Sequence, residues 1–147
     1  MIDVEELKEH SYDVVGAIHA VHKELGPGLY ENIYQEGLKI ELSERNIPFK
    51  KEYSFHPYYH GMELDASYRL DFLVKDDVVI EIKATVGKIN VEQRRQLFNY
   101  MRLCQASVGI LVNFYSSFAE IERYFFDKDR QEICGGDGLP IKDFRKN

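Results

Sequence analysis

The stretch Tyr68 to Ala84, "YRLDFLVKDDVVIEIKA", places charged residues inside two runs that are otherwise apolar and β-branched. Two such runs separated by the turn-forming residues "KDD" are typical of a β-hairpin. Asp71 lies in the first run, and Glu81 and Lys83 lie in the second. Because side chains two positions apart share one face of a strand, Glu81 and Lys83 are predicted to point the same way.

The register of this hairpin follows from its apolar residues. With a three-residue loop at 75–77, one face becomes wholly apolar, through the pairs Leu70–Ile82, Phe72–Ile80 and Val74–Val78. On the other face, Asp71 is then opposite Glu81, and Arg69 is opposite Lys83. A two-residue loop would instead move Glu81 and Lys83 onto the apolar face, so the hydrophobic pattern rejects it.

Two carboxylates on neighbouring strands repel each other unless a cation lies between them. Carboxylate oxygens suit Mg²⁺ or Mn²⁺, so Asp71 and Glu81 are candidate metal ligands. Lys83 could neutralise charge that develops on a phosphate, or help to activate a water molecule. The hairpin therefore carries the residues of a hydrolytic metal site.

The ordinary alternative is a cross-strand cluster of salt bridges on a solvated face. Two features favour a site over that alternative. Leu73 and Val79 share the charged face, so this face is not plainly solvated, and a helical pattern with further polar residues follows at once.

The rest of the chain supplies helices and one more strand. Apolar residues recur at helical spacing over residues 4–25, 29–45 and 90–105. Residues 107–114, "SVGILVNF", form a short apolar β-rich run that is typical of a buried strand. The predicted fold is α/β (α+β), with a mixed central sheet flanked by helices. We expect one domain over residues 1–126, followed by a polar, irregular tail over residues 127–147.

Composition limits the functional classes. A chain of 147 residues with 44% hydrophobic content can bury one core. Its net charge of -6 argues against a broad basic surface for nucleic acid, but it does not exclude acids that hold a cation. No secretory or membrane-spanning pattern occurs, and the two cysteines are far apart, so we expect a cytoplasmic protein without a membrane partner.

Asp71 followed by Glu81-Ile82-Lys83 resembles the core pattern of the PD-(D/E)XK nuclease superfamily, an acid on one strand and E-x-K on the next. This resemblance implies a restriction-endonuclease-like core and metal-dependent phosphodiester hydrolysis.

A second motif makes the resemblance more specific. "GLYENIY" at 28–34 is similar to the Gly-x-x-Glu-x-x-Tyr motif that names the GxxExxY protein family, with Gly28, Glu31 and Tyr34 at the motif positions. The runs "QLFNYMRL" from Gln96 and "VGILVNF" from Val108 also occur in that family's order. The resemblance covers roughly residues 8–126.

The resemblance implies roles for particular residues. The predicted metal ligands are Glu31, Asp71 and Glu81. The predicted catalytic residues are Asp71, Glu81, Lys83 and Gln96. Site-shaping or substrate-binding roles fall to Tyr34, Tyr100, Arg94 and Arg95.

Ordinary explanations stay open for four of these positions. Glu31 also suits the first turn of a helix through the helix dipole, and Tyr34 also suits a core aromatic at helical spacing. Arg94 and Arg95 depart from the small or apolar residues expected there, and they fit either phosphate contact or an exposed helix face.

The expected function is a nuclease that uses Mg²⁺ or Mn²⁺ and hydrolyses phosphodiester bonds in DNA or RNA, with DNA expected ahead of RNA. The alternative is a catalytically inactive module of the same fold that binds nucleic acid or protein. Assembly into a homodimer is compatible with the sequence.

Overall fold

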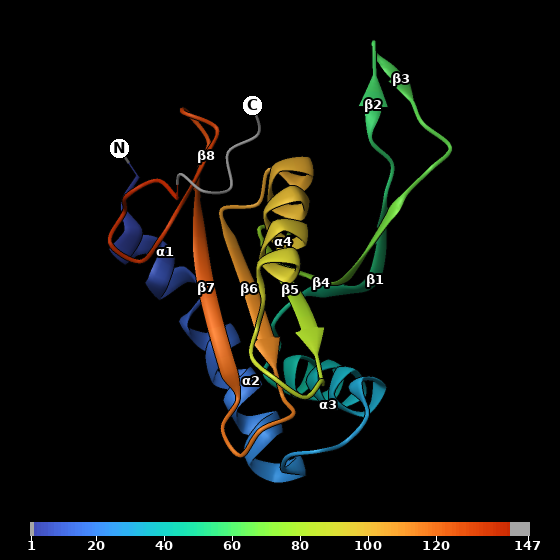
Figure 1. Cartoon of the computed structure of the whole chain (residues 1–147), viewed down its shortest axis with the longest axis vertical. Coiled ribbons are helices and arrows are strands. Elements are labelled where there is room, and N and C mark those ends of the chain that lie inside the picture. Colours follow the sequence, from blue (N-terminus) through green and yellow to red (C-terminus); the bar gives the residue numbers. More distant parts are fainter. Residues whose placement is uncertain (1, 142–147) are drawn as a thin grey trace.

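The computed structural model describes residues 2–141, and within them a six-stranded mixed sheet forms the centre of the molecule (Figure 1). The strands follow the spatial order β1-β4-β5-β6-β7-β8. Their bounds are β1 Phe49–Phe55, β4 Tyr68–Val74, β5 Val78–Lys83, β6 Val108–Asn113, β7 Glu120–Asp127 and β8 Glu132–Cys134. Strands β5 and β6 are parallel, and the other neighbours are antiparallel. The predicted mixed sheet is confirmed.

Helices cover both faces of this sheet (Figure 1). Their bounds are α1 Val4–His10, α2 Tyr12–Leu25, α3 Glu31–Glu44 and α4 Val91–Cys104. Helices α2 and α3 share one hydrophobic core with the inner residues of β4, β5 and β6. Helix α4 makes the crossover between the parallel strands β5 and β6 and packs a second core on the opposite face. The predicted arrangement of a sheet flanked by helices is therefore also confirmed.

The β4–β5 hairpin has the predicted three-residue loop, with Val74 paired to Val78 and Phe72 to Ile80. The ladder ends there, so the predicted pairs beyond Phe72–Ile80 do not form as ladder pairs, and Leu70 belongs to the core beneath α4 instead of the apolar face. On the other side of β4, the pairing with β1 skips the position of Asp71, where Glu52 has a φ of 54°. Asp71 therefore lies where the pairing of β4 is interrupted on both sides, toward β1 and toward β5. Because of this interruption, the side chain of Leu70 packs on the α4 side of the sheet, whereas Phe72 packs on the α2 and α3 side.

The predicted single helix over residues 4–25 is two helices, so that prediction is wrong. Ser11 separates them: its hydroxyl donates to the carbonyl of Leu7 at 2.8 Å and accepts from Arg123 Nη1 at 3.1 Å. A buried serine that bonds back to the preceding turn competes with the helical ladder. Ser11 is fully buried, which fixes this break in place.

The end of the sheet was missed at the sequence level. Strand β7 pairs with β6, and β8 pairs with β7 through Phe126–Ile133, so the segment after Phe126 is not wholly irregular. Cys134 is buried in β8 rather than exposed in a polar tail. The expectation of an irregular tail is therefore wrong for β8, and residues 142–147 lie outside the described part. The domain boundary at residue 126 stays a prediction.

A small hairpin projects from the body of the protein. Strands β2 Tyr58–Tyr59 and β3 Met62–Glu63 form their own two-stranded sheet between β1 and β4. Figure 1 shows them standing clear of the helices and of the central sheet. None of the helices in residues 2–141 has the length and apolar character needed to cross a membrane.

Candidate active site

Asp71 and Glu81 meet at the point where the β4–β5 ladder ends. The backbone N–H of Asp71 donates to Glu81 Oε1 at 3.1 Å, and the backbone N–H of Ile82 donates to Asp71 Oδ2 at 2.7 Å. The two side chains thus make the cross-strand links that backbone groups make elsewhere in the hairpin. Only 4% of the Glu81 residue is exposed to solvent, so the pair is held in a fixed, largely dry position.

This arrangement makes ionisation of the pair costly. Burial, followed by the charge of Asp71, raises the pKa of Glu81 to about 9. Burial also raises the pKa of Asp71, while the hydrogen bond from Ile82 and the charge of Lys83 oppose that shift. Without a bound cation, burial and the neighbouring charge therefore favour the protonated form of Glu81 at neutral pH.

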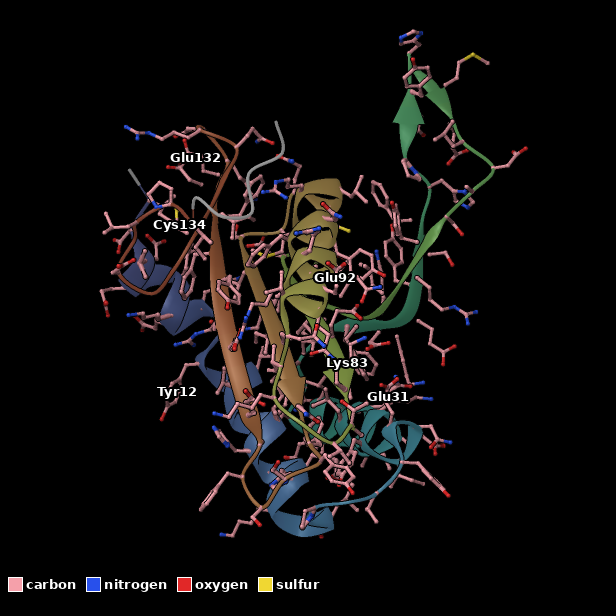
Figure 2. The ribbon with its side chains drawn as sticks, viewed as in Figure 1. Tyr12, Glu31, Lys83, Glu92, Glu132 and Cys134 are labelled. Atoms are coloured by element: carbon pink, nitrogen blue, oxygen red, sulfur yellow. The ribbon has the colours of Figure 1, made fainter. Side chains whose placement is uncertain are left out.

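Glu31 lies beside this pair, at the first residue of α3. Gln35, one turn further along α3, places its amide 3.3 Å from Glu31 Oε2 and 3.3 Å from Asp71 Oδ1, so it bridges the two carboxylates. Partial burial and then the charge of Asp71 raise the pKa of Glu31, and Lys83 opposes this rise. Figure 2 shows Glu31 and Lys83 at the same end of the sheet. Glu31 therefore points toward the hairpin carboxylates and not away from them.

The loop before α3 is held by Tyr34. The Tyr34 hydroxyl donates to the carbonyl of Gly26 at 2.6 Å and accepts from the N–H of Leu29 at 3.1 Å. Its ring is fully buried and stacks on Phe114 with a centroid distance of 4.5 Å. Gly28 has a φ of 79°, which favours glycine there. Tyr34 is thus both a core aromatic and the residue that fixes where α3 begins, and with it the position of Glu31.

On the opposite face of the sheet, helix α4 presents two of the predicted residues to Lys83. Lys83 Nζ lies 3.5 Å from Gln96 Oε1. Tyr100, one turn later, is 5% exposed, and its pKa is raised to about 12 by burial and then by the charges of Glu81 and Asp71. Gln96 and Tyr100 therefore border the cluster of Asp71, Glu81 and Lys83 on the side of α4.

Arg94 and Arg95 point elsewhere. Arg94 forms a two-pronged ion pair with Glu122 of β7 at 2.6 and 2.8 Å, and this contact raises the Arg94 pKa. Arg95 is exposed and lies 3.5 Å from Glu92 of its own helix. The structure brings neither guanidinium group to the hairpin carboxylates.

The chemistry of the three acids fits a hard divalent cation, since carboxylate oxygens are the ligands that Mg²⁺ and Mn²⁺ prefer. Burial raises the pKa of all three acids, and the charge of Asp71 adds to the rise at Glu31 and Glu81, so a bound cation would favour their ionised forms. Within residues 2–141, however, no three or more His, Cys, Asp or Glu side chains gather into a ready metal-binding group. A shared ion stays a prediction.

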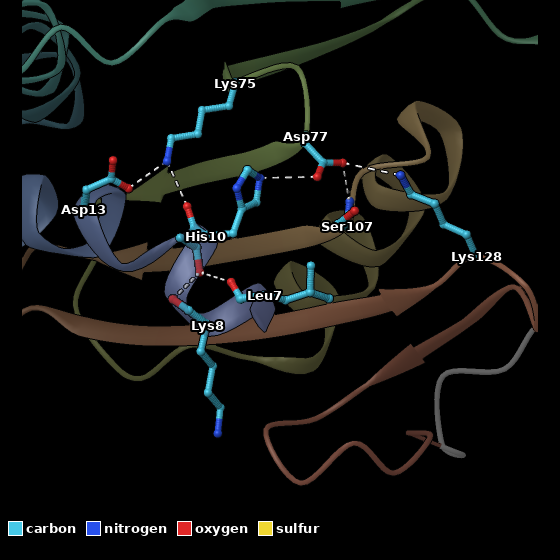
Figure 3. Close-up of polar contacts among 9 residues, drawn as sticks. Leu7, Lys8, His10, Asp13, Lys75, Asp77, Ser107 and Lys128 are labelled. Carbon is cyan, nitrogen blue, oxygen red and sulfur yellow. Dashed lines mark hydrogen bonds and ion pairs between the residues drawn. The ribbon is translucent and has the colours of Figure 1, made fainter. Parts of the chain in front are cut away.

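A second polar cluster lies at the opposite end of the same hairpin, around its turn (Figure 3). One oxygen of Asp77 accepts from the N–H of Ser107 at 3.0 Å and contacts Lys128 Nζ at 3.4 Å. The other lies 3.3 Å from His10 Nε2. Lys75 bonds the carbonyl of His10 at 2.8 Å and Asp13 at 2.9 Å. This cluster ties the hairpin turn to the start of α2, to β6 and to the segment after β7.

The comparisons with known proteins agree with this geometry. The profile of the PD-(D/E)XK nuclease superfamily matches residues 8–124, so this chain belongs to that superfamily. Its members are generally hydrolytic nucleases that typically use divalent metals. The resemblance to the GxxExxY family in particular stays a prediction.

Among solved structures, the chain is similar to one described as "Crystal structure of SSO0001", with 25% sequence identity and a TM-score of 0.51. The similarity covers 63% of this chain and 48% of that one, so this chain matches about half of the other protein's length. No curated protein matches.

Sequence reasoning missed Gln35, which joins Glu31 to Asp71. The signal was present, because Gln35 stands four residues after Glu31 and so shares its face of the helix. It also missed Tyr68, whose ring meets that of Tyr100 edge to face at 5.6 Å. No local pattern in the sequence indicates that contact.

Proposed function

We propose that the protein is a metal-dependent nuclease that hydrolyses phosphodiester bonds in DNA or RNA, with DNA as the first expectation. The observation that carries this proposal is the cluster of Asp71, Glu81 and Lys83 at the end of the β4–β5 ladder, with Glu31 joined to it through Gln35. Superfamily membership supports the reaction class. A cytoplasmic location and a homodimer belong to the same proposal.

The acidic residues and the lysine of this cluster would have different roles in the reaction. Glu31, Asp71 and Glu81 would hold Mg²⁺ or Mn²⁺, after Glu81 gives up the proton that its raised pKa retains. Once held there, the ion would lower the pKa of a water molecule and place positive charge at the phosphate. Lys83 orients that water or neutralises charge that develops on phosphorus oxygens.

Helix α4 and the loop before α3 would hold these groups in place. Gln96 contacts the Lys83 amine, and Tyr100 covers the carboxylates from the side of α4. Tyr34 fixes the start of α3 and with it Glu31. Arg95, exposed on the same helix as Gln96, is available for phosphate contact, whereas Arg94 is engaged by Glu122.

A catalytically inactive module of the same fold, binding nucleic acid or protein, is the second candidate. One observation favours it: the described residues hold no ready group of three metal-binding side chains. In such a module, Asp71 and Glu81 would serve the hairpin alone.

The deciding experiment incubates the protein with Mn²⁺ and mixed nucleic acids. Wild type is compared with the double variant Glu81→Ala, Lys83→Ala, and with Asp77→Asn as a matched control at the other end of the hairpin. We expect cleavage by wild type and by the control, and none by the double variant. Equal residual cleavage by all three proteins would eliminate the enzyme and leave the binding module.

A further inference from the structure

The projecting β2–β3 hairpin exposes a group of large side chains that nothing in the described structure covers. Tyr58, Tyr59 and Met62 are 65%, 64% and 72% exposed. Residues 55–62, "FHPYYHGM", contain no Asp, Glu, Lys or Arg. Glu63 is the first charged residue after this run, and it pairs with Tyr58 across the hairpin. Aromatic rings held away from the core contribute nothing to its packing, so they are available to a ligand.

The hairpin is ordered in advance. His60 and Gly61 have φ values of 51° and 76°, which suit the two-residue turn of a tight hairpin. Its base is closed by the Leu64 N–H, which donates to the Pro57 carbonyl at 2.9 Å, and by His56 Nδ1, which donates to the Leu64 carbonyl at 3.0 Å. At the tip, the rings of Tyr59 and His60 stack with centroids 4.0 Å apart. A ligand would therefore meet rings already held in place.

A row of side chains leads from the hairpin to the candidate site. Tyr68, the first residue of β4, is 42% exposed and meets Tyr100 edge to face. Tyr100 is next to Gln96 on α4, and Gln96 contacts Lys83. The same strand β4 carries Asp71. The hairpin is thus the continuation of one edge of the candidate site.

We propose that the β2–β3 hairpin binds unpaired bases of a nucleic-acid strand by stacking on Tyr58 and Tyr59, and guides that strand past Tyr68 and Tyr100 to Asp71 and Glu81. This inference rests on the proposed function and assigns its substrate a single-stranded segment. Bases stack on aromatic rings whatever their sequence, because every base has a flat π-face. The exposed Arg69 on the stem is placed to meet the backbone phosphates.

The size of the hairpin favours this occupant over a second copy or another protein. Two strands of two residues each offer little area, whereas a stable protein interface buries about 800 Å² on each partner. Stacking of one or two bases requires only one or two rings.

The test uses the absence of tryptophan from the chain. Tyr59→Trp places a single indole at the tip, and Tyr12→Trp places one at a similarly exposed position, 76%, on α2 away from the hairpin (Figure 2). Each variant is titrated with single-stranded oligothymidine and with a blunt duplex at low salt, with Ca²⁺ in place of Mg²⁺. We expect the single strand to quench Tyr59→Trp and to leave Tyr12→Trp unchanged.

Affinity gives an independent measure. Fluorescence anisotropy of a labelled single strand should show binding weakened about tenfold or more in Tyr58→Ala, Tyr59→Ala, and unchanged in Tyr12→Ala. Unchanged affinity and emission at the tip would overturn the inference, as would preference for the duplex. If the emission of Tyr59→Trp shifts with protein concentration in the absence of nucleic acid, the tip contacts a second copy of the chain, and the inference is overturned. If the strand quenches the tip but wild type cleaves nothing, the proposed hydrolysis fails and the hairpin assignment stands.

Discussion

The two ends of the β4–β5 hairpin carry similar acids in opposite surroundings. At the turn, Asp77 is met by Lys128, His10 and the N–H of Ser107, and Asp13 is met by Lys75 (Figure 3). At the other end, burial raises the pKa of Glu31, Asp71 and Glu81, and the charge of Asp71 raises the pKa of Glu31 and Glu81 further. Compensated charge fastens elements together, whereas under-compensated charge is a cost to folding that a ligand can relieve. The difference separates the structural end of the hairpin from the candidate functional end.

The largest expected difference between the two ends is in metal binding. Asp71→Asn should abolish the calorimetric heat of Mn²⁺ binding, whereas Asp77→Asn should retain it. In wild type at neutral pH, binding should release about one proton, because Glu81, with a pKa of about 9, must ionise to become a ligand. Titration in two buffers with different ionisation enthalpies measures that proton. Identical heats from the two variants would remove the distinction between the two ends.

The second difference is the pH dependence of stability without metal. The folded pKa of Glu81 lies above its ordinary value of 4.5, so the folded state retains a proton that the unfolded state has lost. The stabilisation is complete below about pH 4.5 and is lost as the pH rises toward about 9.

Glu81→Gln should reduce this slope, because glutamine keeps an acceptor and a donor where the protonated acid has them, and it should leave the contributions of Asp71 and Glu31, whose pKa values are also raised. Urea unfolding of wild type and variant across pH 5 to about 9 measures the difference. A wild-type curve as flat as that of Glu81→Gln would show that Glu81 is ionised in the folded protein.

A smaller effect tests whether the functional end is positioned by its loop. Tyr34→Phe should keep the stacking on Phe114 and lose two hydrogen bonds, at a cost of about 1–2 kcal/mol in the free energy of unfolding. If the loop positions Glu31, Mn²⁺ affinity should fall with it. Thermal unfolding and calorimetry of the same sample measure both quantities, and an unchanged Mn²⁺ affinity would reduce Tyr34 to a core residue.

The smallest effect is expected at the turn. Lys128→Ala removes one partly exposed contact to Asp77, so the free energy of unfolding should fall by about 0.5 kcal/mol or less, and by less still in high salt. Mn²⁺-dependent cleavage should equal that of wild type. Loss of cleavage in this variant would show that the cluster at the turn contributes to function, and the two ends of the hairpin would then no longer differ in role.

The sequence predicts those parts of the fold in which a local pattern has a single solution. Apolar matching over a short loop specifies the pairing of Phe72 with Ile80, and the placement of Asp71 beside Glu81 follows from it. Leu70 escaped prediction because the carboxylates themselves end the ladder, and strict alternation ends with it.

Contacts between distant segments were beyond a local pattern. Arg94 pairs with Glu122, 28 positions away, and nothing near Arg94 distinguishes an arginine for phosphate from an arginine for β7. The three residues of β8 form a strand only because β7 provides an edge for them. Ser11 breaks the first helix because Arg123 and a buried environment hold its hydroxyl.

The hydrogen bond from the Ile82 N–H to Asp71 affects which residues a descendant of this chain would retain if it lost the proposed activity. Asp71 stabilises the sheet whether or not it also binds an ion, since its carboxylate completes a link between β4 and β5. A descendant that abandoned hydrolysis would still be selected to keep an acceptor at that position. The amine of Lys83 contacts Gln96, and its charge opposes the raised pKa values of Glu31, Asp71 and Glu81. Loss of Lys83 would therefore leave these carboxyl groups less compensated but would remove no side-chain link between β4 and β5. Under the proposed function, loss of Lys83 with retention of Asp71 would be the expected mark of a descendant that no longer hydrolyses its substrate.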